Sequence, residues 1–236
     1  MKYIKVESYE ELSKIASNII ASQVILKPNS VLGLATGSSP LGIYSRLIKL
    51  YKSGNVDFSK VTTVNLDEYM GLTSDNEQSY RYFMNQNLFK KINIDLKNTY
   101  VPNGLCKDVK EECELYDKRI QELGGIDIQL LGIGLDGHIG FNEPDNVFVG
   151  ETHLVDLTES TIDANSRFFN DREEVPKRAL TMGMKSIMQA RKIIIVANGE
   201  QKKEILEKAM FGEITPLIPA SILQLHPDVT VIYSKE

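Results

Sequence analysis

The sequence predicts an α/β protein built on one mostly parallel sheet with helices on both faces. Short apolar runs typical of buried strands alternate with segments of helical periodicity along the chain. Each of four such runs is followed by a polar turn. A length of 236 residues suits one domain of this class, and no repeat, low-complexity tract or linker marks a boundary within residues 1–236.

The first predicted elements are structural. A short strand at residues 3–6 precedes a capping box formed by Ser8 and Glu11. Apolar residues then recur at helical spacing from Leu12 to Ile20, which predicts an amphipathic helix.

Four further strands each end in a group of unusual polar residues. In an open α/β sheet, ligands bind outside the carboxyl ends of the strands, so we expect the four turns to share one crevice. Helices are predicted from Pro40, near residues 78–91 and around Leu206. The predicted strands are residues 31–34, 61–64, 126–131 and 193–196, and the turns are residues 36–39, 65–68, 132–138 and 198–202.

Composition excludes several classes of protein. Apolar residues make up 42% and charged residues 25%, and the net charge is −5 without a basic block, so no nucleic-acid partner is expected. No apolar run approaches the roughly 20 residues of a spanning helix and none resembles a signal peptide, which predicts a cytoplasmic protein without a membrane partner. Cys106 and Cys113 fit neither a disulfide framework nor a zinc motif, so both are expected to be free thiols.

The turn at residues 36–39 offers hydroxyls and free backbone amides at the start of a helix, an arrangement that holds phosphate. An ordinary N-cap turn would have the same composition. Gly37 and Gly42 have the spacing of a nucleotide P-loop, but Ile43 and Tyr44 stand where Lys and Ser/Thr belong. The candidate phosphate ligands of this turn are Thr36, Gly37, Ser38 and Ser39.

Asp67 and Glu68 follow directly after a buried strand. One of two such carboxylates could be partly desolvated and act as a general base. The alternative is that one carboxylate caps a helix and the other is solvated. Only the expectation that this turn lines the shared crevice favours the functional interpretation.

Asp136, His138 and Glu143 form the most informative cluster. A histidine flanked by carboxylates has its tautomer fixed and its basicity raised, which suits a general acid/base near neutral pH. His138 lies between glycines, whereas His153 and His226 are interpreted as ordinary residues. Metal ligation by this cluster, with His153, is chemically possible, but the spacing matches no familiar metal motif, so no metal is expected.

A dinucleotide fingerprint competes for the same segment. Residues 132–137 have the G-x-G-x-x-G spacing, and Asp156 lies where a ribose-binding acid belongs. The fingerprint needs a helix immediately afterwards, and Gly140 and Pro144 interrupt any helical period here.

Two cations could complete a phosphate site. Arg167 lies in the segment 165–169, and Lys202 follows the fourth strand. A single Lys or Arg is more often a solvated surface charge. Each assignment as a phosphate ligand therefore depends on the other residues expected in the crevice.

At these segments the chain resembles the glucosamine-6-phosphate isomerase/deaminase family, whose fold is Rossmann-like. The resemblance covers nearly the whole chain. The related 6-phosphogluconolactonases share the fold and an Asp-Gly-His segment but lack the Phe-Asn-Glu-Pro and Leu-Asp-Glu-Tyr segments, so a sugar-phosphate lactonase is the second interpretation. The matching segments are residues 36–40, 65–69, 134–138, 141–144, 165–169, 201–202 and 223–227.

The resemblance implies a conversion of glucosamine 6-phosphate and water into fructose 6-phosphate and ammonium, without metal or other cofactor. His138, oriented by Asp136 and Glu143, would open the sugar ring, and Asp67 would take the proton from C2 of the open chain. Gly37, Ser38, Ser39, Arg167 and Lys202 would hold the phosphate, and Thr36, Glu68, Tyr80 and Gly134 lie at other family positions expected to contact substrate.

The chain departs from the allosteric hexamers of the family. Those bind the phosphate of N-acetylglucosamine 6-phosphate through an arginine and a lysine, where this chain has His153 and Val155. A valine cannot pair with phosphate, and the chain ends soon after Tyr233. We therefore expect an unregulated enzyme that is a monomer or a weak homo-oligomer.

A sugar-phosphate-sensing regulator on the same scaffold is a third interpretation. Such a protein would carry a DNA-binding domain or lack the catalytic residues. The sequence shows no added domain and retains Asp67, Asp136, His138 and Glu143, which favours an enzyme.

Overall fold

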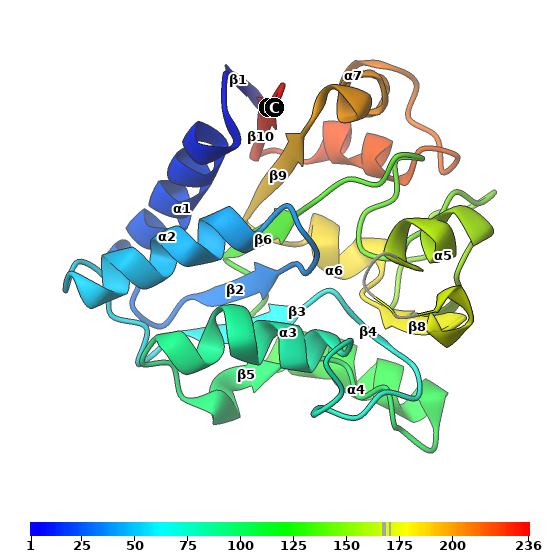
Figure 1. The fold of residues 1–236 in the computed structure, drawn as a ribbon, viewed down its shortest axis with the longest axis horizontal. Helices are drawn as coiled ribbons and strands as arrows, with labels where there is room; N and C mark the ends of the chain where they lie inside the picture. The colour runs from blue at the N-terminus through cyan, green and yellow to red at the C-terminus, as the bar shows by residue number, and fades with distance from the viewer. Residues whose placement is uncertain (167–168, 170) are drawn as a thin grey trace.

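The central sheet is parallel throughout the part of the chain that the computed structural model describes, residues 1–236 without 167, 168 and 170. Its seven strands lie in the order β1-β10-β9-β6-β2-β3-β5 (Figure 1). The prediction of a mostly parallel α/β sheet is therefore confirmed. The strands are β1 (Lys2–Val6), β2 (Val31–Leu34), β3 (Thr62–Asn65), β5 (Thr99–Tyr100), β6 (Ile128–Leu131), β9 (Lys192–Asn198) and β10 (Val229–Ser234).

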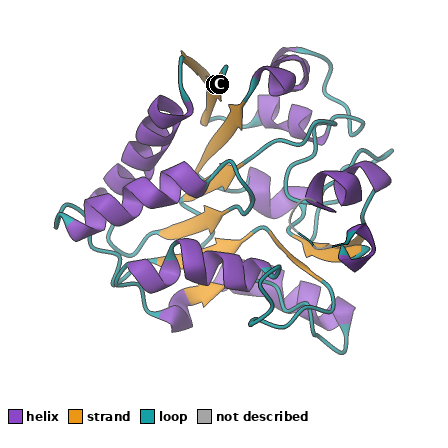
Figure 2. Ribbon diagram, in the orientation of Figure 1, coloured by secondary structure: helices purple, strands orange, loops and turns teal. Residues whose placement is uncertain are grey.

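The sheet is buried on both faces, as the near-continuous apolar runs predict. In β9, Ile194 and Val196 pack into one apolar cluster, and Ile193 and Ile195 pack into a second cluster on the opposite face. This alternation follows from the two-residue period of a strand. Each face must therefore be covered by helices, and Figure 2 shows the strands between two sets of them.

The two faces are covered by different parts of the chain. Helices α1 (Tyr9–Leu26), α2 (Leu41–Lys52) and α3 (Tyr80–Asn87) contribute to the first cluster. The second cluster is covered by α4 (Val109–Glu122), α6 (Met184–Met188), α7 (Lys203–Phe211) and the 3-10 helix η5 (Pro219–Leu225). Short 3-10 turns complete the connections: η1 (Phe89–Lys91), η2 (Leu96–Asn98) and η4 (Glu200–Lys202).

The helix starts follow the sequence signals. The Ser8 hydroxyl accepts a hydrogen bond from the Glu11 amide at 3.2 Å, so the cap of α1 forms as expected. The Glu11 carboxylate, however, accepts from the Glu7 amide at 3.2 Å rather than from Ser8. The helix predicted near residues 78–91 is shorter, since α3 ends at Asn87 and η1 follows as a separate turn.

A second, small antiparallel sheet was not predicted. Its strands lie in the order β4 (Asp67–Tyr69), β8 (Arg178–Thr181) and β7 (His153–Asp156). Asp67 is paired with Thr181, and Thr181 is paired with His153, so one row of residues crosses all three strands. A third apolar cluster, with Tyr69 and Phe141 among its members, joins this sheet to α5 (Glu159–Ser166) and to Val175, which follows the turn η3 (Arg172–Glu174).

Other expectations concern the surface and the thiols. Among the described residues, no helix has both the length and the apolar character needed to cross a bilayer. Cys106 and Cys113 are both free thiols, as the sequence predicts.

Candidate active site

A cleft of about 820 Å³ opens at the carboxyl end of the parallel sheet. It lies where the connections after β2 and β6 leave in opposite directions, since β2 leads to β3 on one side and β6 leads to β9 on the other. The turns after four strands meet there, as the sequence analysis expects. The predicted site residues that line the cleft are Thr36, Gly37, Ser38, Ser39, Asp67, Tyr80, Gly134, Asp136, His138 and Lys202.

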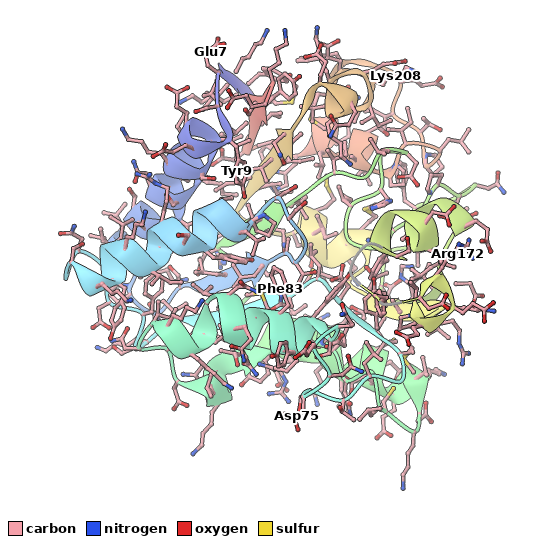
Figure 3. The ribbon with its side chains drawn as sticks, in the orientation of Figure 1. Glu7, Tyr9, Asp75, Phe83, Arg172 and Lys208 are labelled. Atoms are coloured by element: carbon pink, nitrogen blue, oxygen red, sulfur yellow. The ribbon has the colours of Figure 1, made fainter. Side chains whose placement is uncertain are left out.

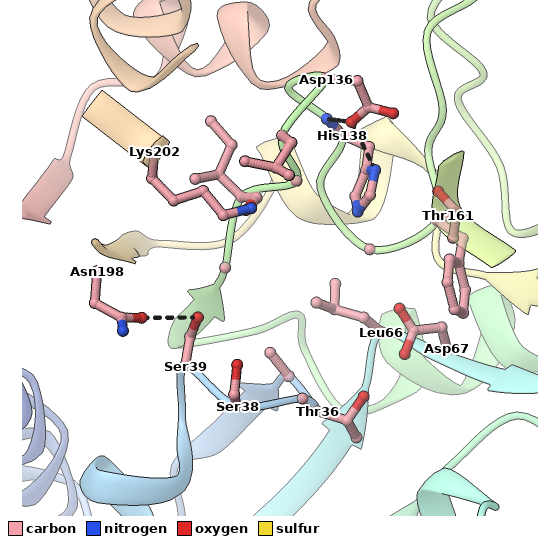
Figure 4. Close-up of a pocket in the computed structure, with 18 of the residues that line it drawn as sticks. Thr36, Ser38, Ser39, Leu66, Asp67, Asp136, His138, Thr161, Asn198 and Lys202 are labelled. Atoms are coloured by element: carbon pink, nitrogen blue, oxygen red, sulfur yellow. Dashed lines mark hydrogen bonds and ion pairs between the residues drawn. The ribbon is translucent and has the colours of Figure 1, made fainter. Parts of the chain in front are cut away.

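His138 lies between two carboxylates. Its Nδ1 is 2.8 Å from an Asp136 oxygen and 3.4 Å from a Glu143 oxygen. The Asp136 carboxylate also accepts the His138 backbone amide at 3.1 Å, which ties the side chain to the turn. Because both carboxylates face Nδ1, that nitrogen carries a proton, and the other ring nitrogen points into the open cleft (Figure 4).

Two opposing effects determine the pKa of His138. Burial lowers the pKa of the imidazole, but the contacts with Asp136 and Glu143 outweigh it and raise the pKa to about 9. Burial acts in the opposite direction on Asp136, and contact with His138 brings the pKa of that carboxyl below its usual range. At neutral pH the site therefore presents an imidazolium that can donate a proton from the nitrogen facing the cleft.

Glycines let the turn after β6 fold closely around the histidine. A side chain at Gly134 would come within 2.4 Å of the His138 ring. Gly140 has a φ of 60°, and a Cβ there would lie 3.0 Å from the Thr181 hydroxyl and 3.5 Å from the Asp67 carboxylate. The turn thus packs directly on the small sheet, and no helix follows it, so the dinucleotide fingerprint lacks the element that it needs.

Asp67 is the first residue of β4 and is only 5% exposed. Burial, with a smaller contribution from the negative charge of Glu68, raises the pKa of the Asp67 carboxyl to about 8, and the charge of His138 opposes this rise. A carboxyl in this environment binds a proton strongly, which is the property of an effective general base. Asp67 and His138 line the same cleft, and Figure 4 shows both side chains directed into it.

The other end of the cleft is built mainly from backbone and neutral side chains. Gly37 has a φ of 91°, a conformation that L side chains rarely adopt. The Tyr9 hydroxyl accepts from the Gly42 amide at 2.8 Å and lies 2.8 Å from the Ser39 carbonyl, to which it donates, so α1 holds the turn from behind. Figure 3 labels Tyr9 at the start of α1.

Asn198, the last residue of β9, and Lys202, in the turn that follows, reach the same end. Asn198 accepts a 3.5 Å hydrogen bond from the Ser39 hydroxyl, and the Lys202 ammonium donates to the Ile133 carbonyl at 2.7 Å. Figure 4 shows both residues across the cleft from Asp67. Amides, hydroxyls and one cation in a single concave site form an anion-binding arrangement.

Two predicted site residues have other positions, and the position of a third is not described. Glu143 reaches His138 from outside the cleft lining, and Thr161 donates to its other oxygen at 2.6 Å. Glu68 does not line the cleft; its carboxylate caps α3, so the helix-cap alternative describes this residue. Arg167 lies outside the described residues.

Sequence reasoning missed several groups at the site. Asn198 belongs to the predicted turn at residues 198–202, which was expected in the crevice, but it was not singled out as a site residue. Thr161 and Tyr9 lie on helices, and their roles depend on tertiary contacts that no spacing in the sequence shows.

Asp136, His138 and Glu143 are also the residues that could hold a metal, because one ligand atom from each lies within 4.8 Å of the others. Both carboxylates face Nδ1, the nitrogen whose proton they stabilise. A cation bound among them would displace that proton, so this donor set suits a charged histidine better than a metal ion.

Comparisons with known proteins agree with one another. The family described as "Glucosamine-6-phosphate isomerases/6-phosphogluconolactonase" matches residues 7–232. A glucosamine-6-phosphate deaminase of Lachnoclostridium phytofermentans is 63% identical over 232 residues, covering 98% of each chain. One of Clostridium perfringens is 55% identical over 236 residues, covering 100% of this chain and 98% of that protein.

Solved structures add the fold. A monomeric glucosamine-6-phosphate deaminase matches with a TM-score of 0.98 at 46% identity, covering 100% of this chain and 98% of that one. A 6-phosphogluconolactonase from Thermotoga maritima matches with a TM-score of 0.75 at 18% identity, covering 100% and 99%. The second likeness concerns the fold alone.

Proposed function

Since the chain belongs to the glucosamine-6-phosphate isomerase/6-phosphogluconolactonase family, we propose that it converts glucosamine 6-phosphate and water into fructose 6-phosphate and ammonium. The observation that carries the proposal is the shared cleft of Asp67 and His138, with an anion-binding arrangement at the other end. A phosphorylated sugar with a reacting carbon far from its phosphate suits such a cleft.

His138 acts first in this proposal. The nitrogen that faces the cleft donates a proton to the ring oxygen of the bound sugar as the bond from that oxygen to C1 breaks, and the C1 hydroxyl releases its own proton to solvent to give the aldehyde. Asp136 and Glu143 hold the imidazole in one orientation and favour its charged form, since both lie near Nδ1. Thr161 fixes the Glu143 carboxylate through its 2.6 Å hydrogen bond.

Asp67 acts next. Its ionised carboxylate takes the proton from C2 of the open-chain sugar, giving an enolamine that isomerises and loses its amine as ammonium after water adds. Because its pKa is raised to about 8, the ionised form grows as the pH rises through that value. Thr36, Gly37, Ser38, Ser39, Gly134 and Lys202 contact the substrate in this proposal, Arg167 adds a cation to the phosphate, and Tyr80 forms a wall beside Asp67.

The protein needs no metal or other cofactor for this sequence of steps, and we propose that it works as a monomer in the cytoplasm. The aligned positions of the activator site hold His153 and Val155. Rates should therefore depend hyperbolically on substrate, and N-acetylglucosamine 6-phosphate should leave the curve unchanged.

The deciding experiment measures two products from one substrate. Purified protein and glucosamine 6-phosphate should yield fructose 6-phosphate and ammonium in equal amounts. The same preparation is offered 6-phosphogluconolactone in parallel. Hydrolysis of the lactone without ammonium release from the amino sugar would contradict the proposal and favour the lactonase.

A further inference from the structure

Glu68 and Asp67 point to opposite faces of β4, because successive side chains alternate along a strand. Asp67 lines the cleft, and Glu68 is directed away from it and is only 3% exposed. A carboxylate buried so fully is costly unless it is hydrogen-bonded, so its partners indicate what it does.

Both oxygens of Glu68 accept backbone amides. One oxygen accepts from Tyr69 and Tyr80, each at 2.9 Å, and the other accepts from Arg81 at 2.9 Å. Tyr80 and Arg81 are the first two residues of α3, whose start lies beside β4 in Figure 1. A negative charge at the N-terminus of a helix is stabilised by the helix dipole.

Ser79 is the neutral cap of the same helix. Its hydroxyl accepts from the Tyr82 amide at 3.0 Å, and its own amide donates to the Asn76 carbonyl at 3.0 Å. Of the four amides without a partner in the helix, two are therefore satisfied by the charged residue of the strand that carries Asp67 and two within or next to the preceding loop.

We propose that Glu68 is a positioning residue of the acid/base site, which fixes the start of α3 and the Tyr80 wall against the strand that carries Asp67. The inference rests on the proposed function, because it assigns Glu68 a part in setting the working state of Asp67.

Tyr80 is the residue through which the start of α3 contacts the cleft. Its ring is stacked on Phe141, with centroids 5.9 Å apart and an angle of 13°, and lies 4.8 Å from Tyr69. Tyr80 also lines the cleft beside Asp67. Displacing the first turn of α3 would separate these rings and admit water to the carboxyl.

Glu68 also acts through its charge. Burial raises the pKa of Glu68, and the three amides that its carboxylate accepts oppose this rise and favour the ionised form. The negative charge of Glu68 in turn contributes to the raised pKa of Asp67. Tyrosines on three other elements interact with Asp67, and burial raises the pKa of each, so they stay neutral in the working range. These tyrosines are Tyr44 of α2, Tyr80 of α3 and Tyr116 of α4. His138 is the charged neighbour of Asp67, and Asp136, Asp163 and Lys202 are charged residues elsewhere in the cleft lining.

The test is the pH dependence of kcat/KM in Glu68→Gln. Glutamine keeps the size of the side chain but removes its charge and turns an amino group toward the Arg81 amide. The acidic limb of the profile should move down by on the order of one pH unit, because Asp67 then loses its proton more easily. KM should rise several-fold as Tyr80 shifts.

Ser79→Ala is the matched control. It removes the neutral cap of the same helix and should lower the melting temperature. Because no charge changes, the acidic limb should stay in place. An acidic limb that moves equally in Glu68→Gln and Ser79→Ala, or in neither variant, would overturn the inference.

Glu68→Asp separates the two effects and replaces the first variant if Glu68→Gln does not fold. It keeps the charge but withdraws the carboxylate from α3. KM should therefore rise while the acidic limb of the pH profile stays in place. Unchanged kinetic constants in Glu68→Asp would overturn the positioning role. Absence of ammonium release by the unaltered protein would instead refute the proposed function itself.

Discussion

The two ends of the cleft are organised by different forces. At the acid/base end, buried and partly buried ionisable groups shift one another's pKa: His138 lies between Asp136 and Glu143, and the charge of Glu68 acts on Asp67 from the opposite face of β4. At the anion-binding end, the turn at residues 36–39 is held by backbone geometry and by the hydroxyl of Tyr9.

The difference separates chemistry from binding. A change to a reacting group at the acid/base end, Asp67 or His138, alters its protonation state or its position, so it should appear in kcat and in the pH profile. A change at the anion-binding end alters contacts made equally with substrate and transition state, so it should appear in KM. Substitutions at each end test this division.

Asp67→Asn should have the largest effect. The amide cannot take the proton from C2, so kcat should fall by roughly 10²–10⁴-fold, the usual contribution of a general base. KM should change little, because Asp67 is not part of the anion-binding end. Steady-state release of fructose 6-phosphate measures both constants, and turnover within about tenfold of the unaltered protein would defeat the assignment.

Gly134→Ala tests whether the position of the imidazole matters as much as its charge. The new methyl group would lie 2.4 Å from the His138 ring, so the ring must move. A displacement of about 1 Å can cost 10²-fold, and a fall in kcat of that order is expected.

Gly132→Ala provides the comparison for that variant. A Cβ there would meet the Ser39 side chain at an ordinary 3.9 Å. Its kcat should stay near that of the unaltered protein, and equal losses in the two variants would mean that the ring position is not the cause.

The pH profile sharpens the comparison through Glu143→Gln. In the unaltered protein, kcat/KM should rise as Asp67 ionises near pH 8 and fall as His138 loses its proton near pH 9. Removing the negative charge of Glu143 lowers the pKa of His138, so the alkaline limb should move to lower pH and the maximal rate should drop about tenfold. An alkaline limb that stays in place would show that another group controls it.

Tyr9→Phe tests the anion-binding end. The variant loses the hydroxyl that accepts the Gly42 amide and donates to the Ser39 carbonyl. Each such bond contributes about 0.5–1.5 kcal/mol, so KM should rise roughly three- to tenfold with kcat nearly unchanged. A fall in kcat alone would contradict the division between the two ends. Tyr82→Phe, on α3, is the control for loss of a tyrosine hydroxyl elsewhere.

Removal of metal ions should have the smallest effect. The carboxylates of Asp136 and Glu143 stabilise a proton on His138, so dialysis against a chelator should leave kcat and KM within experimental error. Loss of activity that added Mg²⁺ or Zn²⁺ restores would show that these residues hold a metal after all.

The sequence predicts the parallel sheet well because its signals are local. Apolar runs near residues 31–34, 61–64, 126–131 and 193–196 are strands that are buried on both faces. The small antiparallel sheet was missed because its strands contain charged residues and form no apolar run. Arg178–Thr181 also pairs with one segment more than a hundred residues away and with another more than twenty residues away. Such pairing depends on tertiary contacts rather than on local propensity.

The candidate site shows the same limit. The strand-end rule brings Thr36, Asp67 and His138 to one edge, and the structure has all three in the cleft lining. Alternation along a strand could have separated Asp67 from Glu68, but only once β4 was known to be a strand. The extent of the single domain stays a prediction.

The row formed by Asp67, Thr181 and His153 connects the interior of the molecule to its surface. Backbone pairing across three short strands joins the buried Asp67 to β7, whose side chains are half-buried or exposed. The strand that carries Asp67 is therefore supported by pairing with residues that lie outside the cleft lining.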